Sequence, residues 1–258
     1  MSGRAPRWAF ITGASSGLGR GLALHYARAG ATVHAAARRR PELEALAAEV
    51  ARAEAPGRIV PVELDVTDAA AQAAAIARAE EEAGGALDLV VANAGVGEPT
   101  PATRMEWRTV KRVLDVNVSA ACVTLAAALP AMVARGEGTL VAVSSLAAFR
   151  GFPGSAAYCA SKAALHAFME SLRVDLRGSG VRALTVYPGF VKTELTAKNR
   201  FFMPFLMELD DAVRIMAKGI ARGEPALLFP LPMAAAARAL GMLPRFLYEP
   251  LAARGPAR

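Results

Sequence analysis

Two residues whose side chains can move a proton lie four positions apart in the segment Tyr158-Cys159-Ala160-Ser161-Lys162. On a helix, residues at i and i+4 project from the same face. A phenol has an ordinary pKa of about 10, and a neighbouring ammonium favours the phenolate and lowers that pKa. The pair could therefore give up or accept a proton at neutral pH. By itself, however, the spacing favours a tyrosine packed on a helix beside a solvated lysine.

A glycine-rich turn follows the first apolar run of the chain. Small residues let the backbone approach a diphosphate, and the N-terminus of the next helix offers free N–H groups and a partial positive charge. The T-G-x-x-x-G-x-G spacing could mark only a tight connection, but its place between a strand and a helix is the context that nucleotide binding requires. The residues expected to bind the cofactor here are Gly13, Ser15, Ser16, Gly17, Leu18 and Gly19.

The residues after the second apolar run bear on the choice between NAD and NADP. An Asp or Glu at this point would hydrogen-bond the ribose 2′-hydroxyl of NAD. This chain instead has Ala37, Arg38 and Arg39, and a guanidinium can hold an anionic 2′-phosphate bidentately. The sequence therefore favours NADP(H), with NAD(H) as the alternative. The run Arg38–Arg40 could also be the solvated start of a helix.

Asp65 and Val66 end the third apolar run. Asp65 is placed to meet an adenine amino group, and Val66 is expected beside it at the cofactor. A turn-making or capping role for Asp65 is about as well supported. Thr67 or Asp68 is the expected N-cap of the helix that follows.

The motifs together resemble the short-chain dehydrogenase/reductase family. Residues of the right types occur in the family's order and approximate spacing over about residues 7–195, and several independent motifs carry the match. They are Thr12–Gly19, Asn93-Ala94-Gly95, Asn117, Ser145, Tyr158 with Lys162, and Pro188-Gly189.

The resemblance implies a role for each of four side chains. Tyr158 is similar to the family's catalytic acid/base. Lys162 resembles the residue that lowers the tyrosine pKa and hydrogen-bonds the nicotinamide ribose. Ser145, preferred on spacing to Ser144, matches the serine that hydrogen-bonds the substrate oxygen. Asn117 matches the asparagine that positions a water for proton relay to the lysine, although a helix-interior Asn can also bond to backbone.

The resemblance also implies two further cofactor contacts. Asn93, Ala94 and Gly95 match a motif that stabilises the sheet and contacts the adenosine side of the cofactor; the preceding Ala92 stands where Asn is frequent. The segment after the sixth apolar run resembles the one that holds the nicotinamide carboxamide. Its expected members are Pro188, Gly189, Val191 and Thr193.

The elements that must position these residues alternate along the chain. Apolar runs with strand character are each followed by longer helical patterns, which is typical of a parallel sheet covered on both faces. The sequence predicts an α/β fold, a Rossmann-like doubly wound seven-stranded parallel sheet in a single domain. The expected strands are Ala9–Thr12, Thr32–Ala36, Ile59–Leu64, Leu87–Ala92, Gly138–Ser144, Val181–Tyr187 and Ala226–Phe229. The expected helices are Leu18–Ala29, Pro41–Ala53, Ala69–Ala83, Trp107–Ala134 with a break near Pro130, and Ala156–Arg177.

The segment after residue 195 is expected to form a substrate lid over residues 195–225, with a C-terminal extension over 226–258. Leu195–Leu209, rich in Phe, Met and Leu, is predicted as a helical flap. Apolar lining indicates a hydrophobic ketone, aldehyde or secondary alcohol, steroid-like or acyl-like. The flap could equally be core or an oligomer contact, and the C-terminal extension could meet substrate, subunit or membrane surface. The expected pocket residues are Leu146, Phe152, Phe190 and Phe202.

Composition excludes several other classes. The net charge of +7 comes from arginines scattered along 258 residues, without the basic stripe and interleaved aromatics of a nucleic-acid-binding protein. Cys122 and Cys159 lack metal-ligand spacing, and no metal site is expected. The apolar stretch Pro225–Leu251 is broken by prolines and arginines, so no transmembrane segment is predicted. A cytoplasmic homodimer or homotetramer is expected.

The sequence thus predicts an NADP(H)-dependent oxidoreductase that moves a hydride between nicotinamide and a carbonyl or secondary alcohol. An NAD-linked alcohol dehydrogenase with the same residues is the first alternative. A non-catalytic nucleotide sensor on the same fold is the second, although the complete set Asn117, Ser145, Tyr158 and Lys162 disfavours it.

Overall fold

Seven parallel strands form one sheet in the order β3-β2-β1-β4-β5-β6-β7. The computed structural model describes residues 5–197, 199 and 202–253. The predicted doubly wound sheet is confirmed, and the predicted strands agree with the observed ones to within two residues at each end. The strands are β1 Trp8–Thr12, β2 Thr32–Ala37, β3 Arg58–Glu63, β4 Leu89–Ala92, β5 Gly138–Val143, β6 Val181–Pro188 and β7 Ala226–Phe229.

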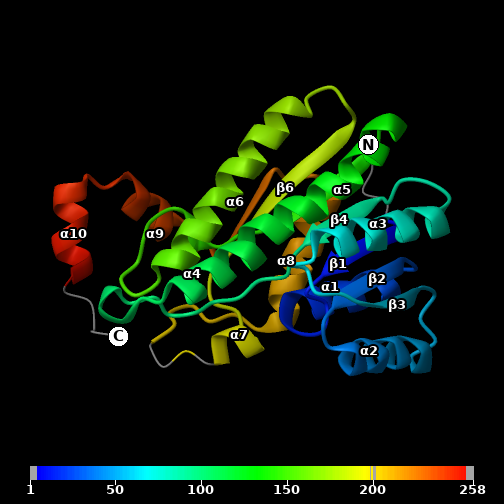
Figure 1. Ribbon diagram of the computed structural model, residues 1–258, viewed down its shortest axis with the longest axis horizontal. Helices are drawn as coiled ribbons and strands as arrows, with labels where there is room; N and C mark the ends of the chain where they lie inside the picture. The colour runs from blue at the N-terminus through cyan, green and yellow to red at the C-terminus, as the bar shows by residue number, and fades with distance from the viewer. Residues whose placement is uncertain (1–4, 198, 200–201, 254–258) are drawn as a thin grey trace.

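Helices cover both faces of this sheet, and alternate strand residues enter two separate cores. In β1, Ile11 packs with α1 (Gly17–Arg28), α2 (Arg40–Arg52) and α8 (Leu209–Arg222). Its neighbour Phe10 packs on the other face with α3 (Ala69–Ala83), α5 (Ala120–Arg135) and α6 (Ala156–Asp175). Figure 1 shows α5 and α6 together over one face. Successive side chains of a strand point to opposite faces, which explains why the runs are apolar throughout.

The order in which strands are added to the sheet changes direction after β3: β2 and β3 lie on one side of β1, and β4 to β7 lie on the other. Strand β1 pairs with β2 on one side and with β4 on the other. In an open α/β sheet, ligands bind outside the carboxyl ends of the strands at such a switch point. The glycine turn after β1 and the residues after β4, β5 and β6 therefore converge at one edge.

The first helical capping prediction is confirmed at α3. The Asp68 side chain accepts a hydrogen bond from the Ala71 N–H at 2.9 Å, so Asp68, not Thr67, is the N-cap. The helix ends at Gly84, whose φ of 70° lies in the left-handed region that favours glycine.

The predicted helix break near Pro130 is wrong. Pro130 lies inside α5, and the irregularity comes earlier, where α4 (Trp107–Leu114) passes through a π-helical turn over Asp115–Ser119 into α5. The wider turn carries Asn117 inward, where its side chain bonds to another segment. Isolated π turns of this kind are found mostly at functional sites.

The same helical run has the length and hydropathy of a membrane span. Over the described residues, Trp107–Arg135 is the one helix that meets both criteria. Its side chains Leu125, Ala128 and Met132 are fully buried in the core beneath the sheet. Packing against the sheet therefore accounts for part of its apolar composition, since 39% of its most apolar window is buried.

The predicted helical flap over Leu195–Leu209 is wrong for most of its length. Only α7, Glu194–Ala197, is helical before α8 begins at Leu209, and residues 198, 200 and 201 lie outside the described part of the chain. Pro204 cannot donate a helical hydrogen bond and Phe205 has a positive φ of 53°, so a helix cannot continue through them. Met207 instead returns as an extended bridge beside Val191.

The C-terminal extension packs beside the segment that follows β5. Helix α9 (Leu231–Met242) contacts β7 and the short 3-10 turn η3 (Leu146–Ala148), and α10 (Arg245–Ala253) follows it. Tyr248 of α10 donates a hydrogen bond to the Gly151 carbonyl, and Arg150 stacks on its ring at 4.1 Å. A second short turn, η1, spans Ala102–Arg104.

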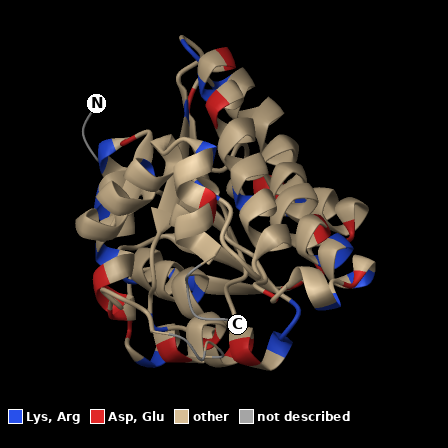
Figure 2. Cartoon of the chain, turned by 90° about the vertical axis from the view of Figure 1, so that its left-hand side faces the viewer, with Lys and Arg blue, Asp and Glu red and all other residues tan. Residues whose placement is uncertain are grey.

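Charged residues are dispersed over the described surface. In Figure 2, basic and acidic segments lie interspersed on the side that faces the viewer. Many of them are paired, as Arg40 is with Glu44 at 2.7 Å and Arg245 with Glu249 at 2.6 Å. The net charge of +7 is thus spread over the fold.

Candidate active site

Lys162 lies one turn after Tyr158 on α6 and is almost fully buried, with 4% of its surface exposed. Its Nζ donates a hydrogen bond to the Val143 carbonyl at the end of β5, at 2.9 Å. The same Nζ lies 5.7 Å from the centroid of the Tyr158 ring. Burial lowers the pKa of Lys162 to about 8. The sequence prediction that both side chains share one helix face is confirmed.

The Tyr158 hydroxyl lies close enough to Ser145, the second residue after β5, for the two side chains to interact. Burial raises the pKa of Tyr158, and the interaction with Ser145 opposes that rise in part. Burial is the largest cause of this shift, and the predicted lowering of the Tyr158 pKa by Lys162, whose Nζ lies 5.7 Å from the ring centroid, stays a prediction. In the structure Tyr158 is therefore a neutral phenol that can donate a proton.

Ser145, and not Ser144, lies at the site. Ser145 Oγ accepts from the Ala147 N–H at 3.1 Å and donates toward the Pro188 carbonyl at 3.5 Å. Ser144 Oγ is buried and donates to the Lys162 carbonyl at 2.9 Å, which holds α6 against β5. The preference for Ser145 on spacing agrees with this geometry.

Asn117 is placed beside the Tyr158–Lys162 helix by the π turn. Its Oδ1 accepts from the Val96 N–H at 2.8 Å, and its Nδ2 donates to the Val96 carbonyl at 2.9 Å and to Ser161 Oγ at 3.0 Å. A Cβ on Gly95 would lie 3.3 Å from Asn117 Oδ1 and 3.6 Å from Lys162 Nζ. The asparagine and the lysine therefore flank the same glycine. Both readings of Asn117 from sequence are compatible with this position.

The glycine turn is shaped by close backbone approaches. Gly13 and Gly17 have positive φ angles of 67° and 55°. A Cβ on Gly19 would lie 2.5 Å from the Gly13 carbonyl oxygen, and one on Gly13 would lie 2.8 Å from the Ala94 Cα. The N-cap residue Ser16 makes no side-chain capping bond. The first N–H groups of α1 therefore face away from side-chain oxygens of their own cap, as a phosphate-binding turn requires.

Asn93 joins β4 to this turn. Its Nδ2 donates to the Thr12 carbonyl at 2.9 Å, and Thr12 Oγ1 accepts from the N–H groups of Asn93 and Ala94 at 3.0 and 3.1 Å. The sheet-stabilising half of the predicted role is thus visible in the contacts. Thr12 was missed as a site residue, although its place at the head of the T-G motif could have indicated it.

Arg39, more than Arg38, reaches over the glycine turn. The Arg39 guanidinium donates to Ser15 Oγ from Nε at 3.2 Å and from Nη2 at 3.0 Å, and it pairs with Glu194 at 3.1 Å. Arg38 is exposed, and its charge helps to lower the pKa of Asp65. The alternative of a solvated helix start fits Arg40, which pairs with Glu44.

Asp65 makes a tight turn with Thr67. Its Oδ1 accepts from the Thr67 N–H at 2.9 Å and from the Thr67 hydroxyl at 2.8 Å. These bonds are the main cause of the lowered pKa of Asp65. The turn-making role that the sequence left open is therefore observed, and Val66 beside it is buried in the core.

The segment after β6 lies against the glycine turn. The Gly189 N–H donates to the Phe229 carbonyl at 2.7 Å, and Val191 is buried. A Cβ on Gly17 would lie 3.3 Å from Thr193 Cγ2, so Thr193 contacts the turn directly. Residues far apart in sequence thus contact one another at the carboxyl ends of the strands, which is where the sequence placed Pro188 to Thr193.

The four residues predicted to line the substrate pocket differ widely in exposure. Leu146 is 4% exposed and packs in a small core with Tyr187 and α9, so it lines no open surface. Phe202 lies at the other extreme, with 86% of its surface exposed. Phe152 and Phe190 are half-buried. Only the helical flap is contradicted, and the shared lining of one pocket by these four residues stays a prediction.

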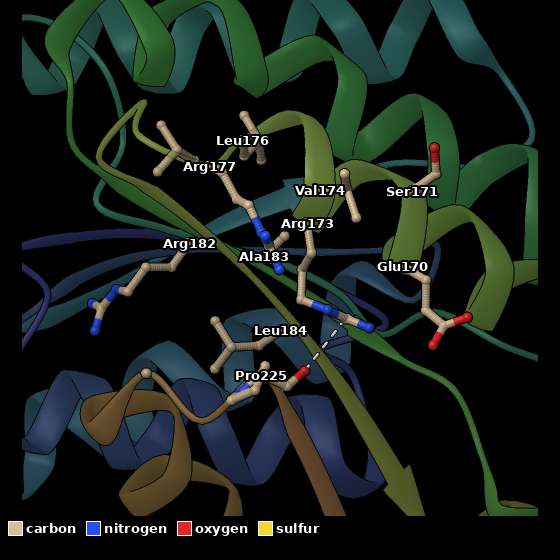
Figure 3. Close-up of a pocket in the computed structure, with 12 residues that line it drawn as sticks. Glu170, Ser171, Arg173, Val174, Leu176, Arg177, Arg182, Ala183, Leu184 and Pro225 are labelled. Carbon is tan, nitrogen blue, oxygen red and sulfur yellow. Dashed lines mark hydrogen bonds between the residues drawn. The ribbon is translucent and has the colours of Figure 1, made fainter.

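An open groove of about 740 Å³ lies elsewhere, at the amino ends of β6 and β7. Figure 3 shows Glu170 and Arg173 on the last turns of α6 and Arg177 after its end, with Arg173 hydrogen-bonded to Pro225. Tyr158 and Ser145 belong to the opposite, carboxyl edge and do not line it. Among the described residues, no group of three or more His, Cys, Asp or Glu could hold a metal ion.

Comparison with known proteins agrees with this geometry. Residues 7–202 match the family described as short chain dehydrogenase. An uncharacterized oxidoreductase of Myxococcus xanthus is 57% identical over 98% of this chain and 99% of its own. One from Mycobacterium tuberculosis is 36% identical over 80% of this chain and 81% of its own.

Solved structures show the same likeness. A short-chain dehydrogenase from Sphingobium yanoikuyae in complex with NADPH is 29% identical, with a TM-score of 0.80 over 97% of this chain and 98% of that one. A putative NAD(P)-dependent gluconate 5-dehydrogenase from Beutenbergia cavernae with bound NADP is 31% identical, with a TM-score of 0.76 over 86% and 94%. The chain is an oxidoreductase that belongs to the short-chain dehydrogenase/reductase family.

Proposed function

We propose that the protein transfers a hydride between NADP(H) and the carbonyl or secondary alcohol carbon of a hydrophobic small molecule. The observation that carries the proposal is the position of the buried Lys162, with Nζ 5.7 Å from the centroid of the Tyr158 ring, together with Ser145, which is close enough to lower the pKa of Tyr158. Two hydroxyl donors that share one position can bind one carbonyl oxygen and stabilise the charge that develops on it.

Tyr158 is the proposed proton donor in the direction of reduction and the acceptor in oxidation. Its raised pKa keeps the phenol protonated, and Ser145 orients the hydroxyl. Lys162 places a positive charge close to the ring, which favours the phenolate as it forms. Asn117 fixes Val96 and Ser161 and thereby the position of this helix. We propose Ser145, Tyr158 and Lys162 as catalytic residues and retain the predicted proton-relay role for Asn117.

The residues present fit a dinucleotide. Glycine backbones crowd the turn, and a side chain on Gly13 or Gly19 would collide with neighbouring backbone. When bound, the nicotinamide cofactor supplies or accepts the hydride. Gly13 to Gly19 would hold the diphosphate and Asp65 with Val66 the adenine side. Asn93, Ala94 and Gly95, with Pro188, Gly189, Val191 and Thr193, would complete the predicted site.

Preference for NADP(H) is proposed from the two guanidinium groups after β2. Arg39 lies on Ser15 of the glycine turn, and Arg38 lies near Asp65. No carboxylate stands at this point in the sequence to accept a ribose hydroxyl. The Sphingobium yanoikuyae relative binds NADPH, which supports the proposal. Use of NAD(H) by the same residues is the alternative.

A hydrophobic substrate is proposed from the residues near Ser145. Phe152 and Phe190 are half-buried, Leu195 is exposed, and a Cβ on Gly97 would touch both Leu195 and the Tyr158 ring. The apolar side chain of Leu195 therefore lies near the tyrosine ring, on the other side of Gly97. We retain the predicted lid over residues 195–225, as an irregular segment instead of a helix, within a single domain.

A panel of ketones, aldehydes and secondary alcohols assayed with NADPH and NADH tests the proposal. We expect reduction of apolar carbonyls, with NADPH used at lower KM than NADH. A protein that binds NADPH tightly but turns over nothing would instead be a nucleotide sensor, and failure to bind either cofactor would refute the proposed function.

A further inference from the structure

His166 and Tyr187 form a short hydrogen bond behind the proposed catalytic residues. His166 is on the third turn of α6, and its Nδ1 lies 2.6 Å from the Tyr187 hydroxyl. Tyr187 is the penultimate residue of β6 and only 1% of its surface is exposed. The bond therefore ties the helix of Tyr158 and Lys162 to the strand that leads into Pro188.

The helix presents this bond on the face that carries the site. Tyr158, Lys162, His166 and Glu170 follow one another at intervals of four residues, so their side chains lie along one stripe of α6. The Glu170 carboxylate lies 3.4 Å from His166 Nε2. His166 is thus held at both ring nitrogens, by Tyr187 on one side and Glu170 on the other.

The direction of the bond follows from the surroundings of Tyr187. Burial raises the pKa of Tyr187, and bonds to Thr185 and the charge of Arg173 only partly oppose it. Arg173 itself donates to Thr185 Oγ1 at 3.0 Å and to the Pro225 carbonyl at 3.3 Å, and Figure 3 shows the second of these bonds. Tyr187 is therefore a protonated phenol, and it is the donor in this bond when the His166 proton is on Nε2, the nitrogen that faces Glu170.

The segment that bears Ser145 meets the same pair. Phe149, four residues after Ser145, packs its ring against Tyr187 with centroids 5.2 Å apart and against His166 at 5.6 Å. Ser145 Oγ also donates toward the carbonyl of Pro188, the residue that directly follows Tyr187. Three chain segments that carry the site therefore converge on two side chains.

We propose that His166 and Tyr187 are positioning residues, whose hydrogen bond sets the separation of the Ser145 and Tyr158 hydroxyls. The inference rests on the proposed function, because its purpose is the alignment of those two donors on one substrate oxygen. The pair acts through the residues it holds and makes no contact with the reacting atoms. A displacement of about 1 Å at such donors can cost about a hundredfold in rate.

Three substitutions test the bond without removing the packing around it. Tyr187→Phe removes one hydroxyl and keeps the buried ring. His166→Leu removes the acceptor, whereas His166→Asn keeps a polar atom near the position of Nδ1. We expect kcat to fall about tenfold in Tyr187→Phe and His166→Leu, with the KM for NADPH changed less than about twofold. His166→Asn should recover much of the loss.

The double variant Tyr187→Phe/His166→Leu separates positioning from general stability. If the two residues act through their hydrogen bond, kcat of the double variant should equal kcat of the slower single variant. If they act independently, the fold-losses of the two single variants should multiply. Tyr26→Phe is the matched control, since Tyr26 is also buried and its hydroxyl has no partner in the described structure. A kcat unchanged in both single variants would overturn the inference.

A measurement without substrate distinguishes this inference from the proposed function. The ionisation of Tyr158 can be followed by ultraviolet difference spectra between each protein and its Tyr158→Phe counterpart. Because Ser145 lowers the pKa of Tyr158, a loosened Ser145 should raise that pKa in Tyr187→Phe, as in the reference variant Ser145→Ala. A shifted titration with no turnover in the wild type refutes the function and supports the positioning role. An unshifted titration in an active enzyme overturns the positioning role alone.

Discussion

The Lys162 ammonium lies over the face of the Tyr158 ring, with Nζ 5.7 Å from the ring centroid, and donates a hydrogen bond to the Val143 carbonyl. The ammonium is therefore held by the strand and not by the phenol. A cation over an aromatic face is attracted to the ring, and it is also close enough to favour a phenolate that forms. The lysine can influence the tyrosine while its position is set independently.

Replacement of Tyr158 by Phe should leave a folded protein that binds NADPH and loses most turnover. The variant removes the proton donor and one of two hydrogen-bond donors to the substrate oxygen, which is expected to cost about a hundredfold to ten-thousandfold. Steady-state turnover and NADPH fluorescence titration measure the two effects. Tyr248→Phe, which alters a hydroxyl on α10 instead, serves as a comparison. A Tyr158→Phe rate near that of the wild type would rule out the proton-donor role.

The arginines after β2 should determine cofactor choice unequally. Arg39→Ala removes a guanidinium bound to Ser15, and Arg38→Ala removes the more exposed one. Each should raise the KM for NADPH far more than the KM for NADH, because only NADPH carries the 2′-phosphate. Arg40→Ala is the matched control, since Arg40 pairs with Glu44. Equal effects on both cofactors would contradict the phosphate assignment.

Lys162 should make stability depend on pH above neutrality. Its pKa of about 8 in the folded protein lies below the value of about 10.4 expected in the unfolded chain. Between these values the unfolded chain binds more protons, so the free energy of unfolding contributed by Lys162 rises with pH. The Tm of the wild type minus the Tm of Lys162→Met should therefore increase from about pH 7 to about pH 9.5.

The control for this titration is Lys218→Met, which removes an exposed lysine of α8. The Tm difference between this variant and the wild type should stay nearly constant over the same range. A constant difference for Lys162→Met as well would show that Lys162 titrates at its ordinary pKa.

Alanine at Gly13 should destabilise the fold and abolish cofactor binding. Gly13 combines a positive φ of 67° with an added Cβ only 2.8 Å from the Ala94 Cα. Such strain costs about 1–3 kcal/mol, which urea unfolding would detect. Gly151→Ala offers a matched control, because an added Cβ there has no heavy atom within 4 Å. If Gly13→Ala matched Gly151→Ala in stability, the close-approach argument would be wrong.

The sheet was predictable because each strand is an uninterrupted apolar run that ends in a turn signal. Asp68 and Gly84 mark the ends of α3 in the sequence itself. The break near Pro130 was predicted wrongly because a proline late in a helix can be absorbed by bending. The real irregularity depends on bonds from Asn117 to Val96, which no local pattern encodes.

The sequence identifies the candidate site residues by their motifs, but not the contacts that hold them in place. Tyr158, Lys162 and Ser145 were identified because their spacing matches that of the family's motifs. The pairing of Arg39 with Glu194 joins residues 155 positions apart, and the His166–Tyr187 bond joins a helix to a strand. Both depend on how the elements pack, so only the folded chain reveals them. The exposure of Phe202 likewise depends on an irregular segment that the sequence predicted as a helix.

The bridge between Val191 and Met207 has a consequence for how this protein could change. Lys192 N–H bonds to the Met207 carbonyl and Met207 N–H to the Phe190 carbonyl, both at 2.9 Å, and Lys192 pairs with Glu208. The two ends of the intervening chain are thus clamped together beside the sheet. Changes confined to positions 195–206 would leave this clamp, Thr193 and the pairing of Arg39 with Glu194 in place. Under the proposed function, substrate preference could therefore change in this segment without altering the residues at the glycine turn.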